Sequence, residues 1–572
     1  MIGVDRGAAP KALSAARVRT GIDRHDALAL GLLLLLFVIA LATFTQYGTT
    51  WDEDYHFWYA HQVIAYYTSF FHDQTALNSP PISYYGALFD VVTALLAPIS
   101  PFGDYATRHL LNVLVGLLGI AGCWRLTRLI GGPRAGLLAA ILLALTPGYY
   151  GHMFNNPKDI PFAAGYVWGL YYMLRLVPHL PRPPRSLVVK LGVVIGMALA
   201  VRVGALLLIC YLGLLLLIVP AIAAARARRP SATIAPWFIE AGSVLAPVLL
   251  ISYAIMLAFW PWAQVDPLWR PIADIIQFDH HDFPYKTLFA GIYYPAPQLP
   301  RIYLPTFFLV QLPELFVALL GIGLVWGPWQ WLKGQWLKGR WLRDRIAFET
   351  VLPIALVVFA ALFPIAFAMA THAVLFDGLR HFIFVEPPLA CCAGLAFNSV
   401  LKRAAQWPRA IAAGAAASLA LYLGYHISIM VALHPDEYVY YNAFVGGVPG
   451  AVGDYKLDYW ANSYHEATDD LVAWLKKRDG ARFAHTIYHV ADCGPGGSVK
   501  PYLPANLRYE DDRDRADFFI AFTQDGCDHL MTGREVAEVD RLGARLSVVL
   551  ALSHPELATK APMTKDGGPK AN

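Results

Sequence analysis

Three consecutive carboxylates, Asp52, Glu53 and Asp54, follow an uncharged apolar segment that covers residues 27–44. Ionised side chains at a membrane boundary need water, a partner or a catalytic task. Aromatic residues dominate the surrounding stretch, 51–71. A carboxylate beside aromatic side chains can have a raised pKa and accept a proton from an attacking hydroxyl. We therefore interpret this segment as the candidate catalytic site. The alternative is a solvated helix start, because acidic residues favour the first helical turn.

A second group of polar residues lies in the loop over residues 151–161. Lys158 and Asp159 carry its formal charges, and Pro157 and Pro161 favour a rigid turn. Asn156 and Asp159 are also typical of a helix start. We interpret Asn156, Lys158 and Asp159 as part of an active-site rim, on the same membrane face as the first acidic cluster.

Further cations are expected at the same depth. Arg202 interrupts an apolar run, and the segment that ends at His381 adds Asp377 and Arg380. A lone arginine there can snorkel harmlessly, or it can bind an anionic lipid head group. Together with Lys158, these residues predict a phosphate-binding group at the outer leaflet.

The composition indicates which elements must position these side chains. Hydrophobic residues make up 57% of the 572 residues and charged residues only 15%, which excludes an ordinary soluble protein. We expect a mostly α, polytopic membrane protein with about eleven transmembrane helices, at roughly 20 residues per crossing. The expected spans are 27–45, 105–127, 134–150, 160–177, 187–202, 204–222, 237–260, 304–327, 349–370, 380–400 and 409–433.

Basic residues set the expected orientation. They concentrate in the N-terminal tail and in alternate connections, whereas residues 45–83 contain no Lys or Arg. The basic side is therefore expected to be cytoplasmic, and the acidic cluster to face outward. This predicts a cytoplasmic tail (1–26), a membrane catalytic domain (27–433) with outward loops at 46–104 and 261–303, and an extracytoplasmic domain (434–572). Within the first loop, the aromatic stretch 54–72 is expected to lie in the membrane interface.

The C-terminal segment has the composition of a small soluble α/β domain. Residues 464–478 are expected to be helical, and 482–490, 516–523 and 546–552 to form strands. The last dozen residues are expected to be disordered. An oxidising compartment permits a disulfide between Cys493 and Cys527, but the sequence gives no distance between them.

Several functions are disfavoured. The run Asp279-His280-His281-Asp282 leaves a divalent metal open as an alternative, but adjacent side chains rarely point the same way, so the ligand spacing does not support a metal site. No other cofactor is indicated. Nucleotide-binding motifs are missing, so a cytoplasmic nucleotide donor is not expected. No nucleic-acid partner is expected either. Ionisable residues within the spans are scarce (Glu314, Glu386 and His426), which argues against an ion-coupled transporter. The repeat over 330–343 is typical of a cytoplasmic interfacial anchor.

The pattern as a whole resembles the GT-C glycosyltransferases. An Asp-Glu pair just past the first helix, a second acid in the next outward loop and an extracytoplasmic tail carry this resemblance over roughly residues 20–435. The similarity is greatest to the protein O-mannosyltransferase and lipid A aminoarabinose transferase branch (glycosyltransferase family 39-like). The motifs at 155–159, 377–381, 434–442 and 458–460 resemble a bacterial subgroup. The tail is too short for the β-trefoil of eukaryotic O-mannosyltransferases, and the Trp-Trp-Asp signature of oligosaccharyltransferases is missing.

The resemblance implies a mechanism and a location. The donor would be a polyprenyl-phosphate sugar, and the acceptor a hydroxyl of a lipid, glycan or protein at the periplasmic face of a bacterial inner membrane. Asp52 would act as the general base of an inverting transfer, although Glu53 is also possible. Glu53 and Asp159 would position the acceptor or the sugar. The residues expected to bind the substrate, including its leaving phosphate, are Asn156, Lys158, Arg202, Asp377, Arg380 and His381.

Two rival functions use the same features. A transporter or flippase of lipid-linked sugars would bind the same donor, and a non-catalytic envelope-assembly scaffold would use the C-terminal domain for binding. Substitution of the Asp52 carboxylate separates them, because only an enzyme would lose its turnover.

Overall fold

The computed structural model describes residues 23–226, 230–279, 286–326, 345–494 and 496–552. The His280-His281 pair, the repeat over 330–343, most of the N-terminal tail and the last dozen residues lie outside these ranges. The chain is mostly helical and carries a small mixed sheet near its C-terminus.

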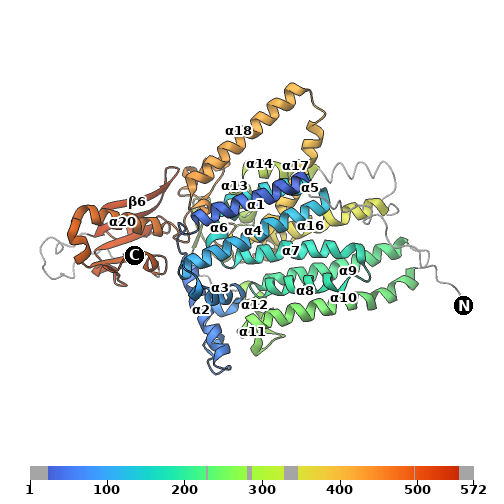
Figure 1. The fold of residues 1–572 in the computed structure, drawn as a ribbon, viewed down its shortest axis with the longest axis horizontal. Coiled ribbons are helices and arrows are strands. Elements are labelled where there is room, and N and C mark those ends of the chain that lie inside the picture. Colours follow the sequence, from blue (N-terminus) through green and yellow to red (C-terminus); the bar gives the residue numbers. More distant parts are fainter. Residues whose placement is uncertain (1–22, 227–229, 280–285, 327–344, 495, 553–572) are drawn as a thin grey trace.

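Seven helices in the described part of the chain are long and apolar enough to cross a membrane. Most of them run alongside one another in a bundle (Figure 1). The chain is therefore a multi-pass membrane protein. These helices are α1 (Arg24–Thr43), α4 (Asp104–Gly131), α9 (Leu206–Arg226), α10 (Pro230–Phe259), α16 (Arg345–Thr371), α17 (Glu386–Ala404) and α18 (Arg409–Leu433).

The predicted count of eleven spans is not confirmed. An eighth span would be formed by α5 (Pro133–Ala144) and α6 (Pro147–Asn155), which are bent by 69° where Pro147 starts the second helix. The other predicted spans form helices that are not both long and apolar enough to be counted. These are α7 (Asp159–Leu176), α8 (Arg185–Leu199), and the series α13 (Tyr303–Gln311), α14 (Glu314–Gly321) and η7 (Ile322–Trp326).

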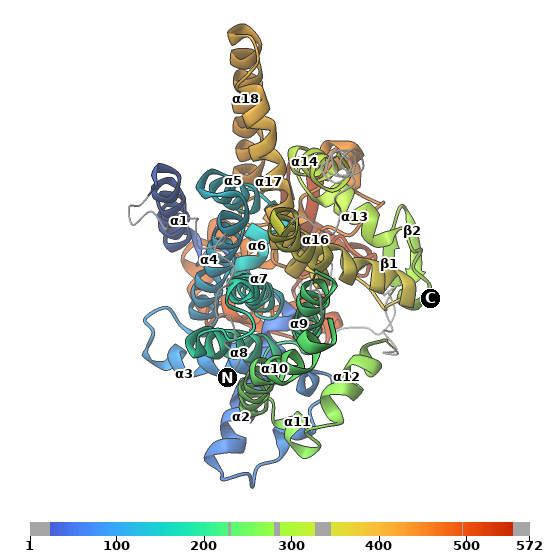
Figure 2. The ribbon, with the colours of Figure 1, turned by 90° about the vertical axis from the view of Figure 1, so that its right-hand side faces the viewer.

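Helix α18 stands apart from the other helices in both views (Figures 1 and 2). Only 11% of its most apolar window is buried inside the protein. Its remaining surface is apolar, as expected of a helix that faces lipid.

The two loops that are predicted to face outward contain further helices and a hairpin. The first loop forms α2 (Trp51–Thr68) and α3 (Leu88–Leu96). The second forms α11 (Pro261–Val265), α12 (Arg270–Asp279) and a hairpin of β1 (Lys286–Phe289) and β2 (Ile292–Pro295). Helix α2 covers most of the aromatic stretch 54–72, whose interfacial location stays a prediction.

The C-terminal segment forms a five-stranded sheet in the order β4-β3-β5-β7-β6, next to helix α20 (Tyr464–Asp479). Strand β3 is parallel to β4 and β5, whereas β7 is antiparallel to β5 and β6. The strands are β3 (Tyr488–Asp492), β4 (Leu507–Tyr509), β5 (Phe518–Phe522), β6 (Gly533–Arg541) and β7 (Ala544–Leu552). The predicted helix and the strands at 516–523 and 546–552 are confirmed. The strand predicted at 482–490 is wrong over its first half, because Gly480–His485 forms a 3-10 helix.

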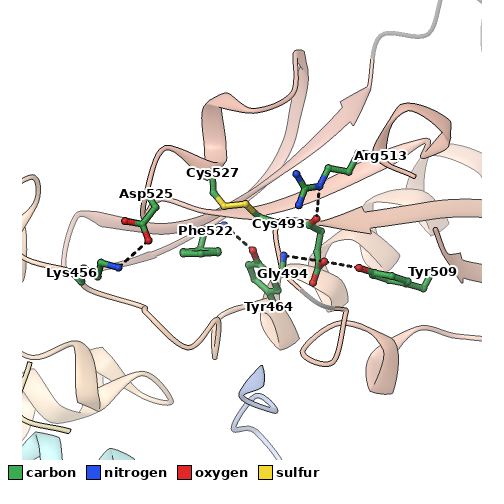
Figure 3. Close-up of a disulfide and its surroundings, with 10 residues drawn as sticks. Lys456, Tyr464, Cys493, Gly494, Tyr509, Arg513, Phe522, Asp525 and Cys527 are labelled. Atoms are coloured by element: carbon green, nitrogen blue, oxygen red, sulfur yellow. Dashed lines mark hydrogen bonds and ion pairs between the residues drawn. A yellow bond between two sulfur atoms is a disulfide. The ribbon is translucent and has the colours of Figure 1, made fainter. Parts of the chain in front are cut away.

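A disulfide joins Cys493 at the end of β3 to Cys527, with Cα atoms 5.9 Å apart (Figure 3). Beside it, the Asp492 carboxylate accepts hydrogen bonds from the Tyr509 hydroxyl at 2.7 Å and from the Gly494 N–H at 3.1 Å. The bond that the sequence permitted is thus present, and it fixes the loop that follows β3.

Candidate active site

The Asp52 carboxylate is the meeting point of three distant segments. Its Oδ2 lies 3.1 Å from Lys158 Nζ and 3.5 Å from Arg380 Nη1. Asp52 is in the first turn of α2, Lys158 directly precedes α7, and Arg380 opens the 3-10 helix η8 (Arg380–Val385). The side chain of Asp52 is 23% exposed, whereas those of both cations are nearly buried. The structure therefore brings together the acid and two of the cations that the sequence indicated.

The start of α7 is built by Asn156 and Asp159. The Asn156 side-chain oxygen accepts a hydrogen bond from the Asp159 backbone N–H at 2.9 Å, and its amide nitrogen donates to the Asp159 carboxylate at 2.9 Å. The same carboxylate forms an ion pair with Arg202. Asn156 and Asp159 are both fully buried, so they hold Lys158 and Arg202 in place.

Arg380 has contacts on several sides. Its Nη1 lies 3.4 Å from Asp377 Oδ2, and its Nη2 lies 3.4 Å from the His381 ring. The guanidinium also lies over the ring of Trp460, 4.7 Å from its centroid, in a cation–π arrangement. Trp460 is fully buried and comes from the C-terminal segment, so this segment contributes directly to the site.

Tyr85 is a further contact of the cations. Its ring lies 4.7 Å from Lys158 Nζ and 5.8 Å from the guanidinium carbon of Arg202. An aromatic face stabilises cations that are held out of water. The sequence analysis missed Tyr85, because it lies in an irregular stretch with many other aromatic residues.

Glu53 does not join this cluster. Its side chain is 1% exposed and accepts a hydrogen bond from the Thr50 backbone N–H at 2.9 Å. It also lies 3.1 Å from the His109 ring. Adjacent helical residues point about 100° apart, so Asp52 and Glu53 face different surroundings. The candidate site therefore contains Asp52 without Glu53.

The segment before α2 is tied to the C-terminal domain. The Gly48 N–H donates to the Asn462 side chain at 2.8 Å, and the Thr49 N–H donates to the Tyr502 hydroxyl at 2.7 Å. The Trp51 ring packs edge-on against Phe522, with centroids 5.6 Å apart. These contacts fix the first turn of α2, and thereby Asp52.

Comparisons with known proteins support the resemblance inferred from the sequence. Residues 87–253, less than a third of the chain, match the family model of the dolichyl-phosphate-mannose-protein mannosyltransferases. This match confirms the resemblance to the GT-C glycosyltransferases. The matched segment includes Lys158, Asp159 and Arg202, and it begins after Asp52.

Solved structures of similar proteins include ArnT from Cupriavidus metallidurans bound to undecaprenyl phosphate. It has 15% sequence identity and a TM-score of 0.48, over 91% of this chain and 97% of that chain. The oligosaccharyltransferase from Archaeoglobus fulgidus in its apo form has 13% identity and a TM-score of 0.43, over 86% of this chain and 65% of that chain. A search of the curated proteins finds no match to the glycosyltransferase. The assignment therefore rests on the family model.

The charges of the glycosyltransferase site perturb one another. Burial alone would raise the pKa of Asp52, but the nearby charges of Lys158 and Arg380 outweigh it and hold this pKa well below its usual value. Burial raises the pKa of Asp377, and Arg380 opposes this shift only in part. Asp52 is therefore the carboxylate that stays ionised between the cations.

Two further buried carboxyl groups were missed by the sequence analysis. Asp90, on α3, lies 2.7 Å from both His56 Nδ1 and Arg108 Nη2, and His56 is one helical turn beyond Asp52 on α2. Asp274, on α12, has two buried carboxylate oxygens without a hydrogen-bond partner. Burial raises the pKa of Asp274 to about 7, and the charge of Arg202 lowers it only in part. A carboxyl group with such a pKa is often functional.

Within the described ranges, no group of three or more His, Cys, Asp or Glu side chains is placed so that it could hold a metal ion. The predicted run at 279–282 lies largely outside those ranges. The cluster described above pairs Lys158, Arg202 and Arg380 with carboxyl groups, and these cations can bind an anionic group that replaces a carboxylate.

Proposed function

We propose that this glycosyltransferase moves a sugar from a polyprenyl-phosphate donor to an acceptor hydroxyl, with Asp52 as the general base. The observation that carries the proposal is the position of the Asp52 carboxylate between Lys158 and Arg380. This arrangement places a proton acceptor beside two cations that can receive a leaving phosphate. The description of the matched family, which names a lipid-phosphate sugar, supports this donor class.

The reaction would proceed in one displacement. The acceptor oxygen forms a bond to the anomeric carbon while its proton passes to the Asp52 carboxylate. The bond between the anomeric carbon and the phosphate oxygen breaks, and its electron pair stays on the phosphate. Attack from the face opposite the phosphate inverts the anomeric configuration. Lys158, Arg202 and Arg380 would stabilise the charge that develops on the leaving group.

Donor binding would prepare Asp52 for this role. A carboxylate with a lowered pKa is a weak base. A donor phosphate would compete with Asp52 for Lys158 and Arg380, the two cations that hold its pKa low. Their transfer to the phosphate would raise the proton affinity of Asp52 at the moment when the donor is in place.

Two observations support an extracytoplasmic site. The stretch that contains Asp52 is free of Lys and Arg from residue 45 to residue 83, as expected of an outward segment. The C-terminal domain, which contacts this stretch, contains a disulfide, and disulfides are typical of oxidising compartments. A lipid, glycan or protein hydroxyl that reaches Asp52 from the periplasm fits the proposed chemistry.

The test is a comparison of envelope glycans by mass spectrometry. A deletion strain is complemented with the wild type, with Asp52→Asn or with Asp54→Asn. The control residue Asp54 is adjacent and acidic, and it accepts a hydrogen bond from Tyr105 at 2.8 Å. We expect one glycan to be lost in the deletion strain and with Asp52→Asn, and restored with Asp54→Asn. Full restoration by Asp52→Asn would refute the catalytic role and favour a transporter or a scaffold.

A further inference from the structure

A small cavity lies beside Arg380, and Asp52 is not among the residues that line it. Its volume is about 20 Å³, which is enough for one water molecule. The cavity is lined by polar groups from four segments, including Arg380, Glu386, His152, Tyr438 and Tyr459. A polar cavity of this size is a typical site for an ordered buried water.

Two of the residues that line this cavity each have a buried polar atom without a hydrogen-bond partner. Arg380 Nε and Glu386 Oε2 are both buried and make no hydrogen bond to the protein. Arg380 is 7% exposed and Glu386 is 2% exposed, so bulk water does not solvate either group. A buried donor and a buried acceptor without partners are costly, and a bridging water satisfies both.

We propose that this cavity binds one water molecule that accepts a hydrogen bond from Arg380 Nε–H and donates one to Glu386 Oε2. Glu386 is then a positioning residue that acts on Arg380 through this water. It is the first residue of α17, so the water links the guanidinium to a membrane-spanning helix. The inference deepens the proposed function, because it rests on the role of Arg380 in binding the leaving phosphate.

The proposed link would fix the plane of the guanidinium. The Nη atoms of Arg380 already contact Asp52, Asp377 and His381. A guanidinium recognises phosphate through the fixed geometry of its planar fork, so its orientation matters as much as its charge. With the Nε side anchored through water to Glu386, the Nη atoms keep their direction when the donor phosphate replaces Asp52.

The first experiment is a high-resolution cryo-EM structure of the intact protein. We expect density for one water within hydrogen-bond distance of both Arg380 Nε and Glu386 Oε2. In Glu386→Leu, which replaces the acceptor by an apolar side chain, the water should be lost and the guanidinium should turn. An empty cavity in the wild type, or an unmoved Arg380 in Glu386→Leu, would overturn the proposal. This readout needs no donor and therefore does not depend on the proposed function.

The second experiment measures the binding of undecaprenyl monophosphate to the detergent-purified protein. Glu386→Leu should bind it about tenfold more weakly, whereas Glu386→Gln, which keeps an acceptor oxygen, should bind within about twofold of the wild type. Glu386→Leu should have no further effect in an Arg380→Gln background. An equal loss in Glu386→Gln, or additive losses in the double variant, would contradict a link through water.

Glu314→Leu is the matched control for this binding experiment. It removes another carboxyl group from the membrane region, one that accepts a hydrogen bond from Tyr422 at 2.9 Å. Binding should be unchanged in this variant, and a tenfold loss would show that removal of any such carboxyl group weakens binding. A wild type that binds no undecaprenyl monophosphate would contradict the proposed donor, and the structural readout would then decide the water site by itself.

Discussion

The Asp52 carboxylate and the Lys158 ammonium are 106 residues apart in the chain and 3.1 Å apart in space. This pair joins the first turn of α2 to the residue that precedes α7. Each charge would be costly by itself in so enclosed a place, because desolvation of an unpaired ion is expensive. In the proposed reaction, the donor phosphate would replace the Asp52 carboxylate as the ionic partner of Lys158.

The role of Lys158 can be tested with Lys158→Gln. Loss of the ammonium removes one of the charges that would stabilise the leaving phosphate, so the rate of transfer should fall about a hundredfold. The measurement is initial rate against donor concentration. Lys456→Gln is the control, because Lys456 forms an ion pair with Asp525 in the C-terminal domain. A rate for Lys158→Gln close to that of the control would refute this role.

A second prediction separates Asp52 from Glu53. The Glu53 carboxylate accepts a hydrogen bond from the Thr50 N–H and lies beside the His109 ring. We therefore expect Glu53→Ala to lower the free energy of unfolding by about 1–3 kcal/mol. Glu53→Gln keeps an acceptor oxygen and should retain activity per folded molecule within a few-fold. Asp52→Asn should lose activity by at least about a hundredfold.

The measurement is activity normalised to the folded fraction, together with thermal unfolding of each variant. Glu53→Gln is the informative variant because it changes charge with little change in shape. If Glu53→Gln is as inactive as Asp52→Asn, then Glu53 takes part in the chemistry and the structural role assigned to it here is wrong.

The convergence of Asp52, Lys158, Arg202 and Arg380 could be predicted because charges at a membrane boundary must find partners. The sequence places all four at the same depth and on the same side. It could not show which of two adjacent acids faces the cations, because that depends on the rotation of α2. Contacts between the segment before this helix and the C-terminal domain contribute to that rotation.

Other features depended on packing that leaves no pattern in the sequence. Asp274 is 1% exposed only because α12 is folded against the protein. Strand β4 has three residues, and the charged strand β6 lies at an edge, so neither shows the apolar alternation of a typical strand. The predicted count of spans is not confirmed, and two of the predicted spans are interrupted at Pro147 and Pro313, in apolar segments that hydropathy alone reads as continuous.

A third prediction concerns the disulfide between Cys493 and Cys527. It closes a loop with a sequence separation of 34 residues, so its removal should destabilise the C-terminal domain by about 3–4 kcal/mol. The loop after β3 lies against α2, since a Cβ atom added at Gly494 would be 3.3 Å from the Trp51 ring. Activity should therefore fall together with stability.

Cys493→Ser and Cys527→Ser should give equal losses in thermal unfolding, and the double variant no further loss. Cys210→Ser is the control, because Cys210 is an exposed free thiol on α9. Larger losses in the double variant than in either single variant would show that the two thiols act separately.

The fourth prediction concerns the pH dependence of stability through Asp274. Burial raises its pKa in the folded protein to about 7, above the value of about 3.9 expected in the unfolded chain. The unfolded state therefore loses its proton first as the pH rises, and stability falls between about pH 4 and pH 7. Three pKa units correspond to on the order of 4 kcal/mol, which is an upper limit for this loss.

Asp274→Asn removes this titration and keeps the shape of the side chain. We expect the variant to gain stability over the wild type at pH 8, and the gain to shrink as the pH falls toward 4, because the wild-type carboxyl group is then protonated in both states. Thermal unfolding in detergent at pH 5 and pH 8 measures the difference. Asp266→Asn is the control, since Asp266 lies in the same loop and is exposed. A gain of equal size at both pH values would show that Asp274 does not titrate in this range.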